Sequence, residues 1–299
     1  MKCIISGGSG FIGRRLVDSL LQDGHYVSVW SRTPGKETRA AVGSFFWDPM
    51  SGEPASESLE DFDAVVHLAG EPVAQRWTPE VKRKIRDSRV QGTQNLVHAI
   101  STLKRRPSVL ICASAIGYYG DRGDEIVTES SSPGKGFLPE VCIEWEKQAD
   151  LAQALGMRVA KIRIGVVLGR DGGALAKMTP AFRSFVGGKV GSGRQWMSWI
   201  HVDDIVGMLR YAIDRPISGV LNGTAPAPVT NAEFTRGLAD ALHRPAVISV
   251  PGFAVKALFG EMGGVVLASQ RVLPKAAEAA GFQFQFPEVR AALKNIFPQ

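Results

Sequence analysis

The stretch Gly7-Gly8-Ser9-Gly10-Phe11-Ile12-Gly13 directly follows the apolar run Cys3-Ile4-Ile5. A strand that enters a glycine-rich turn and then a helix is a cradle for the diphosphate of a dinucleotide. In such a cradle Gly7 makes the tight turn, Gly10 lets the backbone approach the phosphates, and Gly13 lets the helix lie close to the strand. An apolar stripe predicts that helix, and a second strand is expected at 26–30. The stretch therefore predicts nucleotide binding, with ligand contacts expected from Gly7, Gly10, Phe11, Ile12 and Gly13.

Size and composition are those of an ordinary globular protein. The chain has 299 residues, of which 44% are hydrophobic and 21% are charged. Its three cysteines are too few and too scattered for a disulfide framework or a zinc site, so we expect no metal and a reducing compartment. The expected first strand leaves no room for a signal peptide, and no apolar run approaches the roughly 18 residues of a membrane span. We therefore expect a cytoplasmic protein without a membrane partner.

The net charge of +6 is modest, and much of it lies in Lys82-Arg83-Lys84 and Lys104-Arg105-Arg106. Such runs are typical of a solvated helix face, or of a helix end where the dipole favours cations. No nucleic-acid-binding motif and no interleaved aromatic residues accompany them. We therefore expect no nucleic-acid partner.

Strands and helices alternate over the first two thirds of the chain. The expected strands are 44–47, 64–69, 109–113 and 158–163, the helices 78–103 and 138–155, and the loops 114–136 and 165–173. This alternation predicts right-handed crossovers and a doubly wound parallel α/β sheet with helices on both faces. Ligands then bind at the carboxyl ends of the strands, where the glycine-rich loops fall.

The last third has a different, mostly helical pattern. Thr230-Asn231-Ala232-Glu233 has the form of a capping box that begins a helix. Short helices, a strand-like run at 282–286 and a C-terminal helix are expected after it. We therefore assign 1–221 to a nucleotide-binding domain and 222–299 to a small cap, with 170–200 contributing to the substrate side.

Residues 7–13 resemble the glycine motif of the extended short-chain dehydrogenase/reductases, the group that contains the nucleotide-sugar epimerases and dehydratases. Further segments are similar to an atypical branch called "epimerase family protein": Trp47-Asp48-Pro49, Gly117-Tyr118-Tyr119-Gly120, Trp145-Glu146, Arg163–Gly169 and Gly191–Gln195. The resemblance covers nearly the whole chain. It implies a Rossmann-type fold, a nicotinamide dinucleotide cofactor, a small-molecule substrate and a homodimer as a candidate assembly.

The end of the second strand distinguishes two forms of the cofactor. NAD-preferring relatives have a carboxylate there, whereas this chain has Ser31-Arg32-Thr33 and no carboxylate before Glu37. A guanidinium can bind a 2′-phosphate through two charge-assisted hydrogen bonds, and a carboxylate would repel it. We therefore expect Ser31 and Arg32 to favour NADP(H). The alternative is that Arg32 is a solvated charge at a strand end.

The resemblance extends to other parts of the pocket. It implies that Asp48 lies against the adenine amino group, although Asp48-Pro49 is also typical of a turn. It implies that Leu68, Ala69 and Gly70 lie beneath the ribose and diphosphate. Arg89 would reach a phosphate if it faces the sheet ends, and otherwise belongs to the basic helix surface. The nicotinamide side is expected to be bordered by Ala113, Ser114, Gly165 and Val166.

The usual catalytic pair of the superfamily is missing. Relatives carry Tyr-x-x-x-Lys on the helix after the fifth strand, a spacing that puts phenol and ammonium on one face. Aligned on Trp145-Glu146, this chain has Leu138 and Cys142 at those positions, and we expect Cys142 to be structural. Weak catalytic candidates remain in Ser114, near the expected serine, and in Tyr118, whose aromatic pair with Tyr119 is also typical of loop packing.

Two hypotheses about function stay open. We expect His201 and Asp203-Asp204 to begin a helix, and Arg194, in a loop of glycines, is a candidate for binding an anionic substrate group. The leading hypothesis is an NADP(H)-dependent oxidoreductase or epimerase-like enzyme with an unknown small substrate. The alternative is a non-catalytic NADP(H)-binding protein for regulation or redox sensing, linked to cell division because some members of the branch are labelled division inhibitors.

Overall fold

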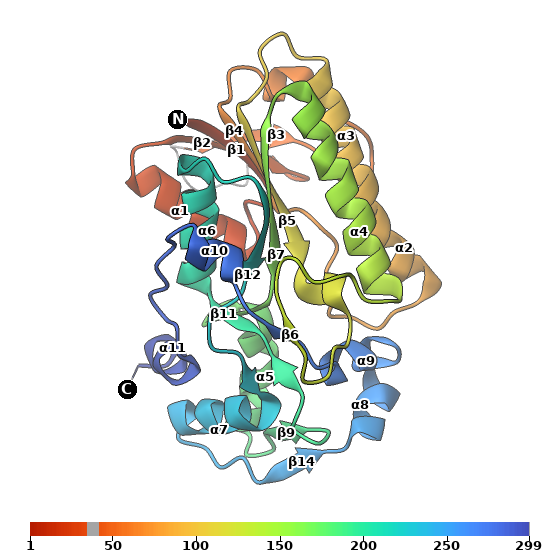
Figure 1. The fold of residues 1–299 in the computed structure, drawn as a ribbon, viewed down its shortest axis with the longest axis vertical. Coiled ribbons are helices and arrows are strands. Elements are labelled where there is room, and N and C mark those ends of the chain that lie inside the picture. Colours follow the sequence, from red (N-terminus) through yellow and green to blue (C-terminus); the bar gives the residue numbers. More distant parts are fainter. Residues whose placement is uncertain (35–41, 299) are drawn as a thin grey trace.

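A parallel sheet forms the centre of the protein (Figure 1). The computed structural model describes residues 1–34 and 42–298. In this part of the chain, seven strands are hydrogen-bonded in parallel in the order β12-β7-β5-β4-β1-β2-β3. They are β1 (Lys2–Ser6), β2 (Tyr26–Ser31), β3 (Val42–Phe46), β4 (Ala64–His67), β5 (Val109–Ala115), β7 (Arg158–Ile164) and β12 (Gly219–Gly223). The predicted doubly wound fold is confirmed.

Helices cover both faces of the sheet (Figure 1). One face carries α1 (Phe11–Gln22), α6 (Val202–Asp214) and α10 (Lys275–Ala279), and the other carries α2 (Pro79–Asp87), α3 (Val90–Ser101) and α4 (Phe137–Asp150). The predicted stripe of α1 is buried, because Leu16, Val17 and Leu20 pack against the sheet. Among the described residues, no helix has the length and apolar character needed to cross a membrane.

The segment between β7 and β12 packs with the C-terminal part of the chain. Within the segment, β8 (Val166–Gly169) pairs with β11 (Trp199–His201). Two further strands of the segment pair with the C-terminal part: β9 (Gly188–Val190) with β14 (Ile248–Val250), and β10 (Trp196–Met197) with β13 (Val229–Thr230). Buried side chains of three helices form one core: α5 (Gly173–Arg183), α7 (Asn231–Leu242) and α11 (Val289–Ile296). The predicted capping box of α7 is confirmed, since Thr230 and Glu233 bond reciprocally. The outer helices are α8 (Gly252–Phe259) and α9 (Met262–Leu267).

Short contacts join the loop after β5 to the C-terminal part. In that loop, η2 (Ile116–Tyr119) is followed by β6 (Ile126–Val127), which pairs with β15 (Arg271–Val272). Gln270 Nε2 donates to the carbonyl oxygens at both ends of η2, Ile116 and Gly120, at 2.9 Å each. Segments far apart in the sequence therefore meet beside the carboxyl end of β5.

Several elements differ from the sequence-based expectations. The expected helix 78–103 is two helices, because the chain bends at Ser88 and Arg89, whose side chains bond to the backbone of Glu71. The expected loops contain η2, β6 and β8, and the expected helix 138–155 ends in the 3-10 turn η3 (Leu151–Leu155). A further 3-10 turn, η1 (Ser56–Ser58), precedes β4.

The expectation of a strand at 282–286 is wrong. The Asp204 carboxylate accepts the N–H groups of Gln285 at 2.7 Å and Phe286 at 3.0 Å, so these donors cannot join a sheet. The run is apolar because the Phe282 ring packs on Tyr211 and Phe284. Its side chains therefore serve tertiary packing rather than a strand.

Candidate functional site

The glycine turn between β1 and α1 leaves the first N–H groups of the helix open. Gly10 is the N-cap of α1 and provides no side-chain cap, and its own N–H donates to the Gly7 carbonyl at 2.9 Å. Gly7 has a φ of +72°, which favours glycine. A Cβ on Gly13 would lie 2.1 Å from the Gly7 oxygen. The turn therefore requires glycine, and the open helix start suits an anion.

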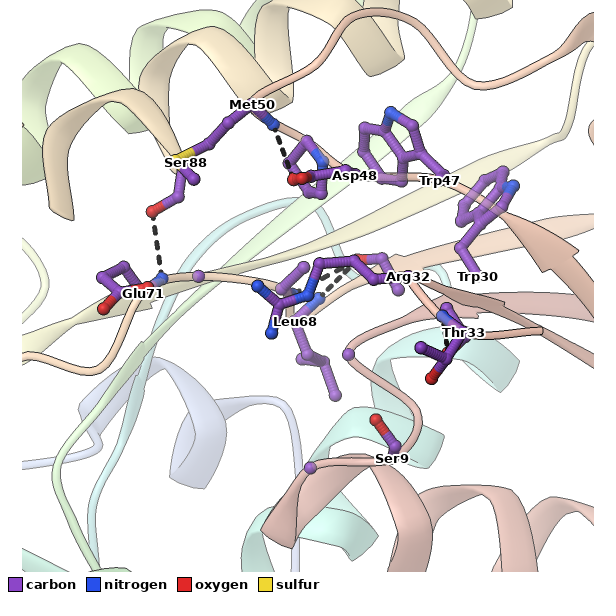
Figure 2. Close-up of a pocket in the computed structure, with 17 residues that line it drawn as sticks. Ser9, Trp30, Arg32, Thr33, Trp47, Asp48, Met50, Leu68, Glu71 and Ser88 are labelled. Atoms are coloured by element: carbon purple, nitrogen blue, oxygen red, sulfur yellow. Dashed lines mark hydrogen bonds between the residues drawn. The ribbon is translucent and has the colours of Figure 1, made fainter. Parts of the chain in front are cut away.

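A cavity of about 280 Å³ begins at this turn, at the carboxyl ends of β1, β2, β3 and β4 (Figure 2). The strand order reverses between β1 and β4, which is where ligands bind in doubly wound sheets. Predicted residues that line it are Gly7, Gly10, Ser31, Arg32, Asp48, Leu68, Ala69 and Gly70. Lining residues that the sequence reasoning missed are Ser6, Ser9, Trp30, Thr33, Trp47, Pro49, Met50, Glu71 and Ser88. The turn and the ends of β1, β2, β3 and β4 thus build one pocket.

The Arg32 side chain extends into this cavity, between Asp48 and Ser9 in the view of Figure 2. The backbone beside it is held by a hydrogen bond from the Thr33 N–H to Ser31 Oγ, at 3.1 Å. No carboxylate pairs with Arg32 among the described residues, and Glu37 lies outside them. The hydroxyls of Ser9 and Thr33 line the same cavity, so a guanidinium and two hydroxyls can meet one anionic group there.

Asp48 forms a turn, which is one of the two roles that the sequence left open. Its Oδ1 accepts the Met50 N–H at 3.1 Å and its carbonyl accepts the Ser51 N–H at 2.9 Å, which makes a turn. The residue also lines the cavity beside Trp47. The Trp47 ring packs edge-on against Trp30, with the ring centroids 5.2 Å apart. An aromatic wall and one carboxylate thus border this end of the pocket.

A buried histidine supports the floor of the pocket, and nothing in the sequence reasoning pointed to it. His67 Nδ1 lies 2.6 Å from Ser6 Oγ, which also accepts the N–H groups of Leu68 and Ala69 at 3.2 Å. Because Ser6 already accepts two donors, its own proton is free to bond to an unprotonated Nδ1. Burial lowers the pKa of His67 from 6.5 to about 4, and the charge of Arg89 adds to the shift.

Acid should destabilise the protein through His67. The unfolded imidazole takes up a proton below pH 6.5, whereas the folded one stays neutral down to about pH 4. The free energy of unfolding should therefore decrease as the pH falls through this window, by about 3 kcal/mol in total from this group. Urea unfolding at a series of pH values measures the slope. His67→Asn should flatten it, because the buried group that titrates is then absent.

Arg89 lies behind the pocket rather than in its lining. Its Nη1 donates to the carbonyls of Glu71 at 2.9 Å and Ile85 at 3.0 Å, and its guanidinium packs over the Trp145 ring. A Cβ on Gly70 would lie 3.1 Å from this guanidinium. Burial lowers the pKa of Arg89 below its ordinary value. We expected Arg89 either at a phosphate in the pocket or on the basic helix surface. In the structure its guanidinium lies next to Gly70, where the carbonyls of Glu71 and Ile85 hold it.

Phe11, Ile12 and Gly165 lie outside the lining of the cavity and support its surroundings. The Phe11 ring packs on the glycines that follow β8, and Ile12 packs against the core. The N–H of Gly165 donates to Gly223 of β12, and that of Val166 donates to Ser198, where the chain passes from the central sheet to the β8–β11 pair. Ala113 is buried within β5. These residues shape the sheet end next to the pocket.

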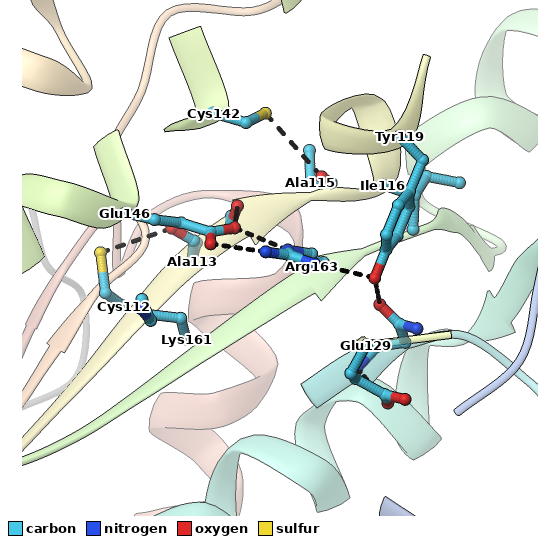
Figure 3. A network of polar contacts seen from close by, with 12 residues as sticks. Cys112, Ala113, Ala115, Ile116, Tyr119, Glu129, Cys142, Glu146, Lys161 and Arg163 are labelled. Carbon is cyan, nitrogen blue, oxygen red and sulfur yellow. Dashed lines mark hydrogen bonds and ion pairs between the residues drawn. The ribbon is translucent and has the colours of Figure 1, made fainter. Parts of the chain in front are cut away.

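A buried polar network lies beyond that end (Figure 3). Ser114 Oγ donates to Glu146 at 2.6 Å, and Arg163 binds both oxygens of Glu146 at 2.8 Å. Arg163 Nη1 also donates to the Tyr119 hydroxyl at 2.9 Å, which donates to Asn222 at 2.7 Å. Burial raises the pKa of Tyr119. Both hydroxyls, those of Ser114 and Tyr119, thus form hydrogen bonds to side chains within the protein.

The positions of the missing catalytic pair are apolar in the structure. Leu138 and Cys142 pack beside Gly117, and Cys142 Sγ lies 3.8 Å from the Ala115 carbonyl. Burial raises the pKa of the Cys142 thiol to about 12, and the nearby charge of Glu146 adds to this. A thiol in these surroundings stays protonated at neutral pH.

Replacing Cys142 should therefore leave the chemistry of the site unchanged. We expect Cys142→Ala to alter NADPH affinity, measured by calorimetry, by less than about threefold and to lower stability by about 1 kcal/mol. Iodoacetamide labelling at neutral pH should be slow in the folded protein. Rapid labelling of Cys142 that NADPH blocks would indicate a thiolate mechanism instead.

Three further candidates have clear positions. The ring of Tyr118 lies over the Arg163 guanidinium, 3.4 Å from ring centroid to Cζ. His201 is the N-cap of α6 and accepts the Asp203 N–H at 3.1 Å, as expected of a helix start. Arg194 is exposed in the turn between β9 and β10. None of the three lines the cavity at the glycine turn.

Solved structures have the same fold as this chain. A crystal structure of the human epimerase family protein SDR39U1 with NADPH is 37% identical, with a TM-score of 0.88 and 99% of both chains covered. A UDP-glucuronic acid 4-epimerase from Bacillus cereus, solved with UDP-glucuronic acid and NAD, has a TM-score of 0.81 over 99% of this chain and 98% of its own. At 18% identity, that second likeness shows the fold alone.

Sequence comparisons agree along the whole chain. The "Epimerase family protein SDR39U1 homolog, chloroplastic" of Arabidopsis thaliana is 45% identical over 99% of this chain and 86% of its own length. The epimerase family protein YfhF of Bacillus subtilis is 36% identical over 99% and 98%. A domain of unknown function, DUF1731, matches residues 250–296. Residues 3–224 match the model of the NAD dependent epimerase/dehydratase family, and the chain belongs to this family.

Proposed function

We propose that the protein binds NADP(H) and acts as an oxidoreductase or epimerase-like enzyme on a small substrate. The observation that carries this proposal is the cavity that runs from the open start of α1 to Arg32. One end offers backbone N–H groups to a diphosphate, and the other offers a guanidinium to a further phosphate. The NADPH in the human crystal structure, at 37% identity, supports the same cofactor here.

The residues present fit such a dinucleotide. The glycines of the turn leave room where the diphosphate approaches, and the Ser6–His67 pair fixes the strand end beneath it. Arg32, Ser9 and Thr33 would hold the 2′-phosphate, while Asp48 and the neighbouring tryptophan would border the adenine. When bound, the cofactor supplies or takes a hydride at its nicotinamide ring. The role of the protein is then to orient that ring and to place a substrate against it.

Arg32 should determine the preference for NADPH over NADH. One charge-assisted hydrogen bond is typically worth about 1.5–3 kcal/mol, or roughly 10- to 150-fold in affinity. Calorimetry should show that Arg32→Ala reduces the NADPH advantage by this order and leaves NADH affinity nearly unchanged. Arg105→Ala, at an exposed arginine far from the cavity, is the control. Equal affinities of the wild type for both cofactors would contradict the assignment.

Tyr118 is the phenol best placed to act as a proton donor. The Tyr119 hydroxyl is held between Arg163 and Asn222, whereas no hydrogen bond of the Tyr118 hydroxyl to a described residue is formed. The Arg163 guanidinium lies over the face of its ring, 3.4 Å from ring centroid to Cζ, and holds the ring in place. Tyr118 follows Gly117, which packs against the residues that replace that pair.

A turnover screen separates the enzyme from the alternative. Protein with NADPH is mixed with carbonyl compounds, including keto sugars linked to nucleotides, and loss of the reduced nicotinamide absorbance is followed. Turnover that decreases in Tyr118→Phe at unchanged NADPH affinity supports the enzyme and this proton donor. NADPH binding with neither net oxidation of the nicotinamide nor epimerisation of the sugars, checked by chromatography of the products, supports the non-catalytic alternative, which Leu138 and Cys142 at the positions of the catalytic pair favour.

A further inference from the structure

A second surface of the protein combines apolar and basic side chains at the end of the molecule farthest from β1–β3 (Figure 1). We call it the β9–β14 surface and define it as the exposed and half-buried residues of 183–189 and 243–258. The pairing of Gly188 with Ile248 brings these two segments together. Val247 is 84%, Phe253 78% and Leu258 68% exposed, and Phe185 and Val186 are more than half exposed. Large exposed side chains on two segments that pair with each other indicate an interaction site.

The same surface carries positive charge and no negative charge of its own. Segments 172–202 and 241–260 contain no aspartate or glutamate. Arg183, Lys189 and Lys256 are exposed on this surface, and Arg244 is half-buried in it. The acids that flank it are paired elsewhere, Asp240 with Arg290 at 3.9 Å and Glu261 with Lys82 at 2.8 Å. The partner that fits this surface is therefore anionic and able to accept apolar side chains.

A hollow of about 340 Å³ lies at one side of the surface, and its charged lining residues are arginines with one histidine. Arg170, Arg183 and Arg244 border it, and none of them has an acidic partner among the described residues. The Arg244 guanidinium packs over the exposed Phe185 ring at 5.0 Å, and its Nε is buried without a described hydrogen-bond partner. The arginines of the hollow can thus donate hydrogen bonds to a phosphate, and the Phe185 ring beside them is exposed and apolar.

We propose that the β9–β14 surface docks on a bilayer that contains anionic phospholipids. The aromatic and aliphatic side chains would enter the boundary between headgroups and acyl chains, and the arginines and lysines would bind headgroup phosphates. A second copy of the chain fits the surface less well, because a two-fold interface would place these positive charges against each other. This proposal differs from the expectation of no membrane partner, which rested on the lack of a spanning segment.

Flotation with vesicles tests the proposal on the full-length protein. Vesicles of phosphatidylcholine with phosphatidylglycerol should bind the protein, vesicles of phosphatidylcholine alone should bind it weakly, and salt should reduce the binding. Phe253→Ser with Leu258→Ser should lower the fraction bound by roughly tenfold or more. Arg183→Ala with Arg244→Ala should lower it by about fivefold per arginine, and only on the anionic vesicles.

The matched control is Phe46→Ser with Lys104→Ala. Phe46 is 59% exposed on the edge strand β3, at the other end of the molecule. NADPH affinity and melting temperature of every variant report intact folding. No binding to anionic vesicles, or an equal loss in the control variant, would overturn the proposal. A concentration-dependent dimer in light scattering that Phe253→Ser with Leu258→Ser abolishes, without vesicle binding, would instead assign the surface to a second copy.

Discussion

Gly10→Val should abolish NADPH binding while the protein remains folded. Gly10 has a φ of −74° and a ψ of 174°, a conformation that valine adopts readily. Apart from its chain neighbours and the helix backbone, the nearest atom to a Cβ there is the Gly7 oxygen, at 3.1 Å, a close contact that a shift of a few tenths of an ångström in the turn relieves. Its methyl groups would fill the space that the diphosphate needs next to the N–H groups of α1.

The expected loss of affinity is roughly hundredfold or more, since at least two charge-assisted hydrogen bonds of about 1.5–3 kcal/mol each disappear. Calorimetry with NADPH measures the affinity, and the melting temperature reports folding. Gly264→Val is the matched control, because a Cβ at Gly264 would meet no described atom within 4 Å apart from its chain neighbours and the backbone of its own helix. Normal NADPH binding by Gly10→Val would place the cofactor elsewhere.

Glu146→Ala should produce the largest loss of stability. Glu146 is 7% exposed and its partner Arg163 is 4% exposed, so removal of the carboxylate leaves a buried guanidinium without its counter-charge. Burial alone disfavours that charge, and the hydrogen bonds and charge of Glu146 outweigh it, so that the pKa of Arg163 is raised. Breaking a buried ion pair in this way costs about 3–5 kcal/mol.

Urea unfolding at neutral pH measures this loss, with Glu144→Ala as the control. Glu144 lies on the same helix, α4, and pairs with Arg86 at the surface, where an ion pair contributes about 0–1 kcal/mol. The double variant Glu146→Leu with Arg163→Leu should recover part of the stability, because no charge is then left buried. If Glu146→Ala and Glu144→Ala lose the same amount, the network is not a structural support.

The parts of the fold that were predictable depend on short-range patterns. The cap of α2 uses Thr78 and Pro79, and the capping box of α7 lies within four residues. The end of α2 was not predictable, because Ser88 bonds to the N–H of Glu71, which lies in another segment. The conformation of 282–286 depends on Asp204, about eighty residues away in the chain. Hydrophobic periodicity contains no information about such partners.

The part of the pocket that lies at the carboxyl ends of the strands could be predicted from the sequence. Gly7, Arg32 and Leu68 come together because the carboxyl ends of neighbouring parallel strands meet at one edge. The support by His67 was not predictable, since a single histidine within an apolar strand is commonly a satisfied core residue. Arg89 lies in the segment that was expected to be helical, but its long side chain bonds to the carbonyls of Glu71 and Ile85. The position of a residue along a helix does not determine which of several nearby acceptors a long side chain binds.

The position of β12 has a consequence for folding during synthesis. This strand covers one edge of β7, yet Gly219–Gly223 is made only after the whole segment that carries α5, β9 and α6. Until that strand leaves the ribosome, the backbone donors and acceptors on the outer edge of β7 have no strand partner. A nascent chain that stops before residue 219 would expose a free sheet edge. We therefore expect chaperone binding to persist until about this length has emerged.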